Sequence, residues 1–203
     1  MKLGKSFWIK LGIESMLIVF SVLLALALNE YRAASKEDER TRQSMVSIRQ
    51  ELLENKKIIQ QWQQIHQEAL TNIEAYRNRA APQDSLVVNH RFQFEKIFEG
   101  TLIPNIVRST AWETAKSTGI LHNFDLQLAN SLSDIYDMQR IGVANSADNL
   151  IALIFERPTH EQERVGQTLM LFQLTITELV GQESYLILAY DDVIKKLDGE
   201  LED

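Results

Sequence analysis

Histidine and carboxylate side chains are the residues of this sequence that could bind a metal ion or move protons. A di-iron site in a helical bundle needs Glu-x-x-His on two helices, because that spacing puts both ligands on one face. None of the four histidines has a Glu at that distance. The residues three positions before them are Gln63, Val87, Gly119 and Arg157. His160 and Glu161 lie beside Pro158, which is typical of a solvated turn. The sequence therefore predicts no metal site.

Three polar residues fall at positions that helical spacing assigns to buried seams. We expect His66 to be a core histidine with one hydrogen bond. A buried carboxylate needs a partner or a raised pKa, so we expect Glu183 to meet a Lys, Arg, His or Asn of a neighbouring helix. A functional role for Glu183 stays open. Asn55 is expected to set the register of its helix rather than to bind a ligand.

Covalent and cofactor chemistry have no sequence support. The chain contains no Cys, no G-x-S-x-G, no H-E-x-x-H and no Gly-rich phosphate loop. The acidic pair Asp191 and Asp192 is expected on a solvated helix face. A net charge of −7 argues against nucleic acid as a partner. We therefore predict a non-enzymatic protein without a cofactor.

Composition favours an ordered helical protein. Of the 203 residues, 45% are apolar and 24% are charged, which argues against disorder. Only 8 Gly and 3 Pro are present, too few for the turns of a β-sandwich or barrel of this length. The fold must therefore be built from a few long elements.

The segment from Leu11 to Leu28 is long and apolar enough to cross a membrane. Eighteen helical residues span about 27 Å, close to the hydrocarbon thickness of a bilayer, and Glu14 is the only charge among them. A cleaved signal peptide remains an alternative because Ala25-Leu26-Ala27 fits a cleavage site; a buried soluble helix is a second alternative. We predict a retained span whose anchor residues are Trp8, Leu11, Leu17, Ile18, Phe20, Leu24, Leu28 and Tyr31.

Orientation follows from the residues on either side of the span. Three Lys precede it and four basic residues follow within about fifteen positions, so the two sides nearly tie. A short basic head of ten residues resists translocation, which favours an amino terminus in the cytoplasm. The predicted location is a bacterial inner membrane, with residues 1–32 forming the head and span and residues 33–203 lying in the periplasm.

The rest of the chain predicts three long helices. Apolar residues follow 3-4 spacing from Met45 to Tyr76 and again from Val165 to Leu197, and a shorter series runs between Asn123 and Pro158. The first helix is expected to run to about Arg79. The last is expected to start at Thr159 with a capping box. Seam residues from these series that would pack or bind a partner are Asn55, Trp62, His66, Leu179, Glu183 and Leu186.

Residues 86–121 are expected to form an insert with a short helix. Thr110 and Glu113 fit a capping box and Gly119 would close that helix, which carries Trp112 as a further packing residue. Residues 86–108 are expected as a short helix or an extended strip. The predicted fold is all-α: an amino-terminal transmembrane helix followed by an antiparallel bundle of three long helices plus a short fourth helix.

Two stretches together resemble a known group of proteins. One is IVFSVLLALALNEYR; the other is STAWETAKSTGILHNFDLQLANSLSDIY, with Trp112, Gly119, Leu132 and Tyr136. Their order and spacing resemble a broad group of uncharacterised bacterial single-span membrane proteins that share a domain of unknown function. One of the paired aromatic residues of that group is replaced here by Ile135. The resemblance implies an inner-membrane anchor and a helical outer domain, and it carries no activity.

The sequence leaves two hypotheses of different kinds. The first is a membrane-anchored interaction protein, an accessory subunit or scaffold of an inner-membrane complex, with the lipid bilayer and a membrane protein or a second copy as partners. The second is a periplasmic ligand-sensing bundle that signals through a partner, by analogy of fold alone. Its apolar pocket would lie at Phe92, Phe94, Phe98 and Trp112, but we expect this cluster to be a small satellite core beneath the insert instead.

Overall fold

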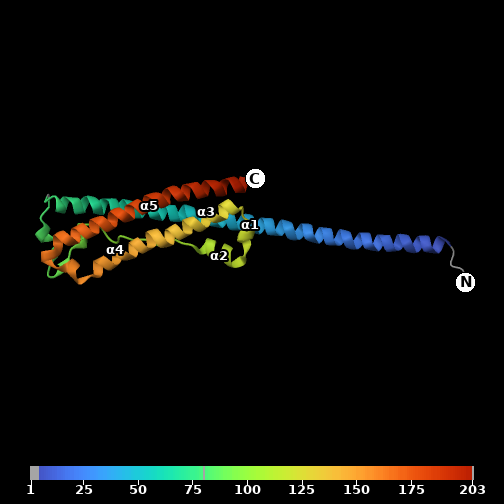
Figure 1. Cartoon of the computed structure of the whole chain (residues 1–203), viewed down its shortest axis with the longest axis horizontal. Helices are drawn as coiled ribbons and strands as arrows, with labels where there is room; N and C mark the ends of the chain where they lie inside the picture. Colours follow the sequence, from blue (N-terminus) through green and yellow to red (C-terminus); the bar gives the residue numbers. More distant parts are fainter. Residues whose placement is uncertain (1–4, 80, 203) are drawn as a thin grey trace. The chain divides into compact units, whose positions relative to one another are not determined.

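The computed structural model describes residues 5–79 and 81–202, with the side chains of residue 12 and of residues 14 onward within those ranges. The chain divides into two units, residues 1–43 and 44–203. The all-α class is confirmed, because helices account for nearly all of the described secondary structure. The long helices are α1 (Lys5–Arg77) and α5 (Val165–Glu202), and a third helical run lies between them in sequence (Figure 1).

The first unit is the amino-terminal part of α1. Between Met16 and Leu28 the described apolar side chains are largely exposed, including Leu17, Ile18, Phe20, Leu24 and Leu28 of the predicted anchor. Tyr31 is also exposed, whereas the side chains of Trp8 and Leu11 lie outside the described residues. This helix is long and apolar enough to cross a membrane. An exposed surface of this kind is unstable in water, which agrees with the predicted span.

The second unit places the remainder of α1 antiparallel to α5. Polar pairs mark the direction: Lys56 Nζ lies 2.5 Å from Asp191 Oδ1, and Gln63 Nε2 donates to Ser184 Oγ at 2.7 Å. Nearer the start of α1, Arg49 pairs with Asp198. As residue numbers rise along α1, the numbers of the paired residues on α5 fall, so the two helices run in opposite directions (Figure 1).

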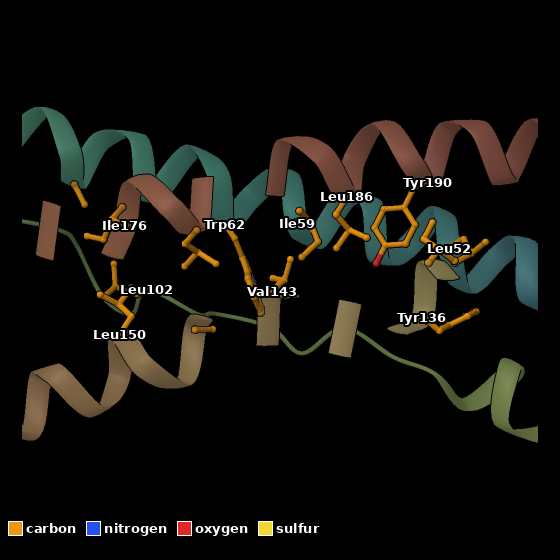
Figure 2. Packing of buried hydrophobic residues seen from close by; sticks show 14 of the residues in the cluster. Leu52, Ile59, Trp62, Leu102, Tyr136, Val143, Leu150, Ile176, Leu186 and Tyr190 are labelled. Atoms are coloured by element: carbon orange, nitrogen blue, oxygen red, sulfur yellow. The ribbon is translucent and has the colours of Figure 1, made fainter. Parts of the chain in front are cut away.

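The third helical run packs against α5 and comprises α3 (Leu126–Asp137), the π-helical segment η4 (Met138–Ala144) and α4 (Asn145–Phe155). Its buried side chains meet those of α1 and α5 in one core, and Figure 2 shows Val143 and Leu150 facing this core. A π-helical hydrogen bond spans one more residue than an α-helical one. The buried faces of α3 and α4, on either side of η4, are therefore rotated relative to each other about the helix axis. The apolar spacing of the sequence predicts the run but not its interruption.

Residues 86–108 are neither a helix nor a simple extended strip. Strands β1 (Val87–Val88) and β2 (Arg91–Phe92) form a hairpin, with Asn89 at φ 51° and His90 at φ 57° in its turn. Positive φ at both turn residues is the geometry that suits a two-residue hairpin, and Asn tolerates it well. Short 3₁₀ turns flank the hairpin at η1 (Gln83–Ser85) and η2 (Phe94–Lys96).

Helix α2 (Thr110–Thr118) begins at Thr110 as predicted, but the predicted cap is not the one observed. It begins after Ser109 with no cap from its own chain segment, so the expected Thr110–Glu113 capping box is absent. Helix α3 begins slightly later than the series that starts at Asn123, because η3 (Ile120–Asn123) takes up the first residues and Asp125 caps α3 by accepting from the backbone N–H of Gln127 and Leu128. A capping pattern identifies a residue able to cap, whereas tertiary contacts decide which residue does so.

The start of α5 is likewise later than predicted. Two 3₁₀ turns, η5 (Arg157–His160) and η6 (Gln162–Arg164), precede Val165. The Thr159 hydroxyl donates to the carbonyl of Leu153 at 2.7 Å, so it closes α4 instead of opening α5. The expected end of α2 is observed, since Gly119 adopts φ 73°.

Candidate functional site

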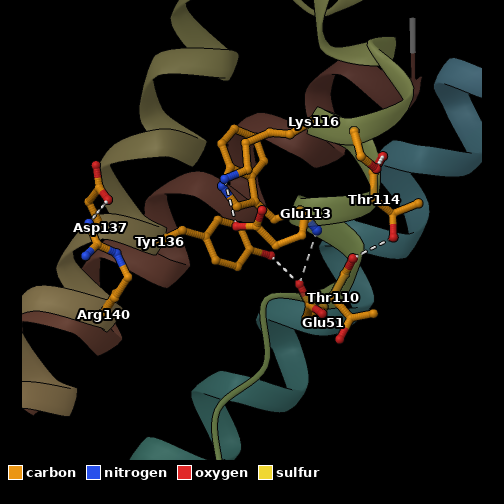
Figure 3. Close-up of polar contacts among 10 residues, drawn as sticks. Glu51, Thr110, Glu113, Thr114, Lys116, Tyr136, Asp137 and Arg140 are labelled. Carbon is orange, nitrogen blue, oxygen red and sulfur yellow. Dashed lines mark hydrogen bonds and ion pairs between the residues drawn. The ribbon is translucent and has the colours of Figure 1, made fainter.

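A buried carboxylate joins three helices of the second unit. Glu51 of α1 is only 8% exposed. Its Oε2 accepts from the backbone N–H of Ala111 at 2.9 Å, and its Oε1 accepts from that of Trp112 at 3.5 Å and from the Tyr136 hydroxyl at 2.7 Å (Figure 3). Glu51 thus supplies the acceptor that the first turn of α2 lacks in its own sequence.

Aromatic stacking reinforces this cluster. The Trp112 and Tyr136 rings lie 5.3 Å apart between centroids with an interplanar angle of 4°, and Lys116 Nζ lies 5.5 Å from the centre of the indole ring. Burial raises the pKa of the Tyr136 hydroxyl, and the hydrogen bond to Glu51 raises it further. This tyrosine is therefore a fixed hydrogen-bond donor rather than a proton-transfer group at neutral pH.

A second polar network lies one helical turn along α1. Asn55 accepts from the Arg108 backbone N–H at 2.8 Å and donates to the Arg108 carbonyl at 2.6 Å, pairing with the main chain as a β-strand would. Its amide also donates to Gln139 Oε1 at 3.1 Å, and the Tyr190 hydroxyl donates to the same oxygen at 2.6 Å. Asn55 therefore attaches the segment before α2 to the core.

The third buried polar contact joins His66 of α1 to Glu183 of α5. His66 Nδ1 and Glu183 Oε1 are 2.8 Å apart, and both side chains are fully buried. Among the described residues, His66 Nε2 and Glu183 Oε2 have no hydrogen-bond partner. Burial raises the pKa of Glu183, and the contact with His66 opposes that change. The structure thus brings together two residues that the sequence analysis had singled out separately.

The remaining seam residues are packed rather than exposed. Leu179 and Leu186 are fully buried on α5, Trp62 is 3% exposed, and the Nε1 of Trp62 has no hydrogen-bond partner in the described part of the chain. Asp191 and Asp192 lie on the outer face as expected and pair with Lys56 and Lys196. Leu179, Leu186 and Trp62 therefore form no surface that a partner could reach.

The predicted aromatic cluster is divided between two places. Phe92 and Phe94 have ring centroids 4.8 Å apart, and Phe94 lies 6.0 Å from Phe98, whereas Trp112 stacks on Tyr136. His160 closes the first group: its Nδ1 accepts from the Phe92 N–H at 3.1 Å, and its Nε2 lies 3.0 Å from the carbonyl of Ile154. Treating these four aromatic residues as one cluster was therefore wrong, because residues near in sequence diverge after Phe98.

An apolar cavity of about 650 Å³ opens beside Phe94 and Phe98. Trp62 of α1, Leu102 of the segment before α2, and Ala147 of α4 contribute further walls. Small-molecule sites are mostly apolar clefts of roughly 300–1,000 Å³. The cavity therefore has the size and lining of a ligand site, although Phe92 and Trp112 do not line it.

Sequence reasoning missed Glu51, Gln139 and Tyr190 as polar members of the core. Glu51 stands three residues after the buried Ile48 and four before Asn55, a spacing that places it on the buried face of α1. That signal is present in the sequence. Gln139 had no such signal, because the π-helical segment decides where it points.

Neither the arrangement of possible metal ligands nor the comparison with known proteins indicates a reaction or a cofactor. Within residues 5–79 and 81–202, no group of three or more His, Cys, Asp or Glu side chains is placed to hold a metal ion. No family model, curated protein or solved structure matches the chain. The resemblance based on Trp112, Gly119, Leu132 and Tyr136 stays a prediction.

Proposed function

We propose that this protein is a non-enzymatic, membrane-anchored interaction protein, an accessory subunit or scaffold of a bacterial inner-membrane complex. In this proposal the amino-terminal part of α1 crosses the bilayer from a cytoplasmic head, and the second unit lies in the periplasm. The exposed apolar surface of residues 16–28 supports the anchor. The non-enzymatic character is supported by the polar core, in which Glu51, Asn55 and Gln139 bind backbone groups and Asn55 also binds Gln139.

An exposed apolar stripe on α5 carries the proposal. Leu171, Leu174, Tyr185 and Leu188 are 37%, 60%, 63% and 68% exposed, and together with Glu178 and Gly181 they follow 3-4 spacing along one face. Single exposed apolar residues are ordinary, but a repeat of this kind is typical of the seam of a helix–helix interface. The stripe is about 26 Å long at 1.5 Å per residue. It suits one helix of a partner.

A shallow groove adjoins the stripe. It has a volume of about 290 Å³ and lies between η4 and α5, where Gly142, Gly181 and Tyr185 contribute to its walls. Glycines let the backbone of a second helix approach closely. A partner helix could therefore pack its ridge of side chains into this groove while it covers the apolar stripe.

The test is recovery of the partner from native membranes. Full-length protein with a carboxyl-terminal tag is extracted in mild detergent, separated by size, and analysed by mass spectrometry. We expect a stoichiometric membrane protein, or a second copy of this chain, to travel with it. The double substitution Leu174→Glu and Leu188→Glu should release that partner because it places two charges in the interface.

Leu126→Glu is the matched control. Leu126 is 72% exposed but lies at the start of α3, away from the stripe. The control should retain the partner and the helical circular dichroism of the unchanged protein. A protein that travels alone, or equal loss of the partner in both variants, would contradict the proposed interface.

Ligand sensing is a second candidate because the apolar cavity beside Trp62 favours it. The residues that line the cavity are not those of the stripe on α5, so a ligand and a partner helix would bind at separate places.

A further inference from the structure

We infer that the cavity beside Trp62 binds a single-chain amphiphile with an aliphatic body and a positively charged head. This inference goes beyond the proposed interaction and names the ligand class of the second candidate function. It rests on the lining of the cavity, on the one carboxylate at its edge, and on the exposed apolar residues around it.

The walls specify the body of the ligand. Trp62, Phe98, Leu102 and Ala147 present rings and aliphatic groups to a volume of about 650 Å³. Transfer of each methylene group from water into such a site contributes roughly 0.8 kcal/mol. An aliphatic chain gains from every wall without needing a hydrogen-bond partner.

Asp148 specifies the head. It is the charged residue of the cavity lining, it is exposed, and no ion pair or side-chain hydrogen bond is described for it. A carboxylate at the edge of an apolar site attracts a cation and repels an anion. An alkylammonium head would therefore lie beside Asp148, whereas a fatty-acid carboxylate would be disfavoured.

Two exposed apolar side chains mark the opening. Ile106 is 81% exposed and Ile151 is 37% exposed, and both contribute to the cavity lining. Ile106 belongs to the segment between η2 and α2, which has no regular secondary structure around it. Asn55 holds this segment at Arg108, and Asn105 donates to Gln61 Oε1 at 3.4 Å. A chain entering the cavity would cover Ile106 and remove its contact with water.

The experiment compares three ligands with the same body. Octylamine, octan-1-ol and octanoate are titrated calorimetrically into full-length protein in lipid nanodiscs, with empty nanodiscs as the blank. We expect octylamine to bind at least tenfold more tightly than octanoate, with octan-1-ol between them. Equal affinity for the amine and the acid, or no binding of any of the three, would overturn the inference.

Variants separate the two parts of the site. Asp148→Asn should lower octylamine affinity about tenfold, to that of octan-1-ol, and leave octan-1-ol unchanged. Asp134→Asn, an exposed carboxylate on α3, is the matched control and should change neither. Unchanged octylamine affinity in Asp148→Asn would refute the assigned head.

Filling the cavity tests the body. Ala147→Trp should abolish binding of all three ligands while circular dichroism shows an unchanged helix content. If this variant does not fold, Ile151→Trp replaces it, since Ile151 lies at the opening and a bulky uncharged side chain there should block entry of the aliphatic chain. Full binding in a folded cavity variant would place the ligand elsewhere and overturn the inference. Because purified protein is used, failure here leaves the partner experiment unaffected.

Discussion

Glu51 and Glu183 are both buried carboxyl groups of the helical core, yet their surroundings differ sharply. Glu51 is 8% exposed and accepts hydrogen bonds from two backbone N–H groups and a hydroxyl. Glu183 is fully buried and meets only His66, with its second oxygen unpartnered among the described residues. Burial of a carboxyl group is tolerated at the first site because donors surround it, and it is costly at the second.

The difference shows two ways in which α1 contacts its neighbours. Glu51 fixes the start of α2, so its contribution is to the position of a separate helix. The His66–Glu183 pair joins α1 to α5, which leucine packing at Leu179 and Leu186 already holds together. We therefore expect the Glu51 cluster to contribute more to stability than the second pair.

Removal of the Glu51 carboxyl group should have the largest effect. Glu51→Ala leaves the Ala111 N–H and the Tyr136 hydroxyl without their acceptor, so the free energy of unfolding should fall by about 3 kcal/mol. Thermal unfolding of full-length protein in mild detergent, followed by circular dichroism, measures this. Glu51→Gln keeps one acceptor oxygen and should lose less. An equal loss in the two variants would mean that hydrogen bonding is not the cause.

Loss of one partner at the second site should cost less. His66→Leu leaves Glu183 without its hydrogen bond, and we expect a loss of about 2 kcal/mol because one buried contact is lost there instead of several. The double change His66→Leu and Glu183→Leu should recover most of that loss, since replacing a buried pair by apolar residues is often neutral. A double variant less stable than the single variant would show that the pair itself stabilises the core.

The Tyr136 hydroxyl makes a smaller contribution. Tyr136→Phe removes the donor at 2.7 Å from Glu51 but keeps the ring that stacks on Trp112, so about 1.5 kcal/mol should be lost. The same unfolding measurement applies, and near-ultraviolet circular dichroism should still report an ordered stack. If stability does not change, the two backbone donors alone satisfy Glu51.

The pH dependence of stability distinguishes Glu183 most finely. Because burial raises its pKa above the ordinary value of 4.5, the folded state binds more protons than the unfolded state just above that pH. The stability gained from protonation should thus decline as pH rises from 4.5 towards the folded pKa. Glu183→Gln should remove this decline and should be more stable than the unchanged protein at pH 7, because it buries no ionisable carboxyl group.

Glu163→Gln on the exposed turn before α5 is the control for that experiment. It should keep the decline of the unchanged protein. A Glu183→Gln profile parallel to the unchanged one would show that another group causes the pH dependence.

The spacing of apolar residues in the sequence predicted the long helices, but it did not predict where each of them begins. Spacing of apolar residues predicted α1, the run from α3 to α4, and α5, because burial of one face is a local property of the sequence. The hairpin turn at Asn89 and His90, the π-helical segment and the later start of α5 were not predicted, because apolar spacing does not specify the backbone conformation of individual residues. Asn55, His66 and Glu183 were found by their seam positions, but their partners were not, since spacing along one helix contains no information about the facing one.

Site-specific photo-crosslinking in living cells tests whether the stripe on α5 is an interface. A photoreactive phenylalanine derivative is incorporated at Leu188, and separately at the control position Leu126, which is similarly exposed. We expect one crosslinked species of defined mass from position 188 and none from position 126. The same crosslinks from both positions, or none from position 188 in intact membranes, would contradict it.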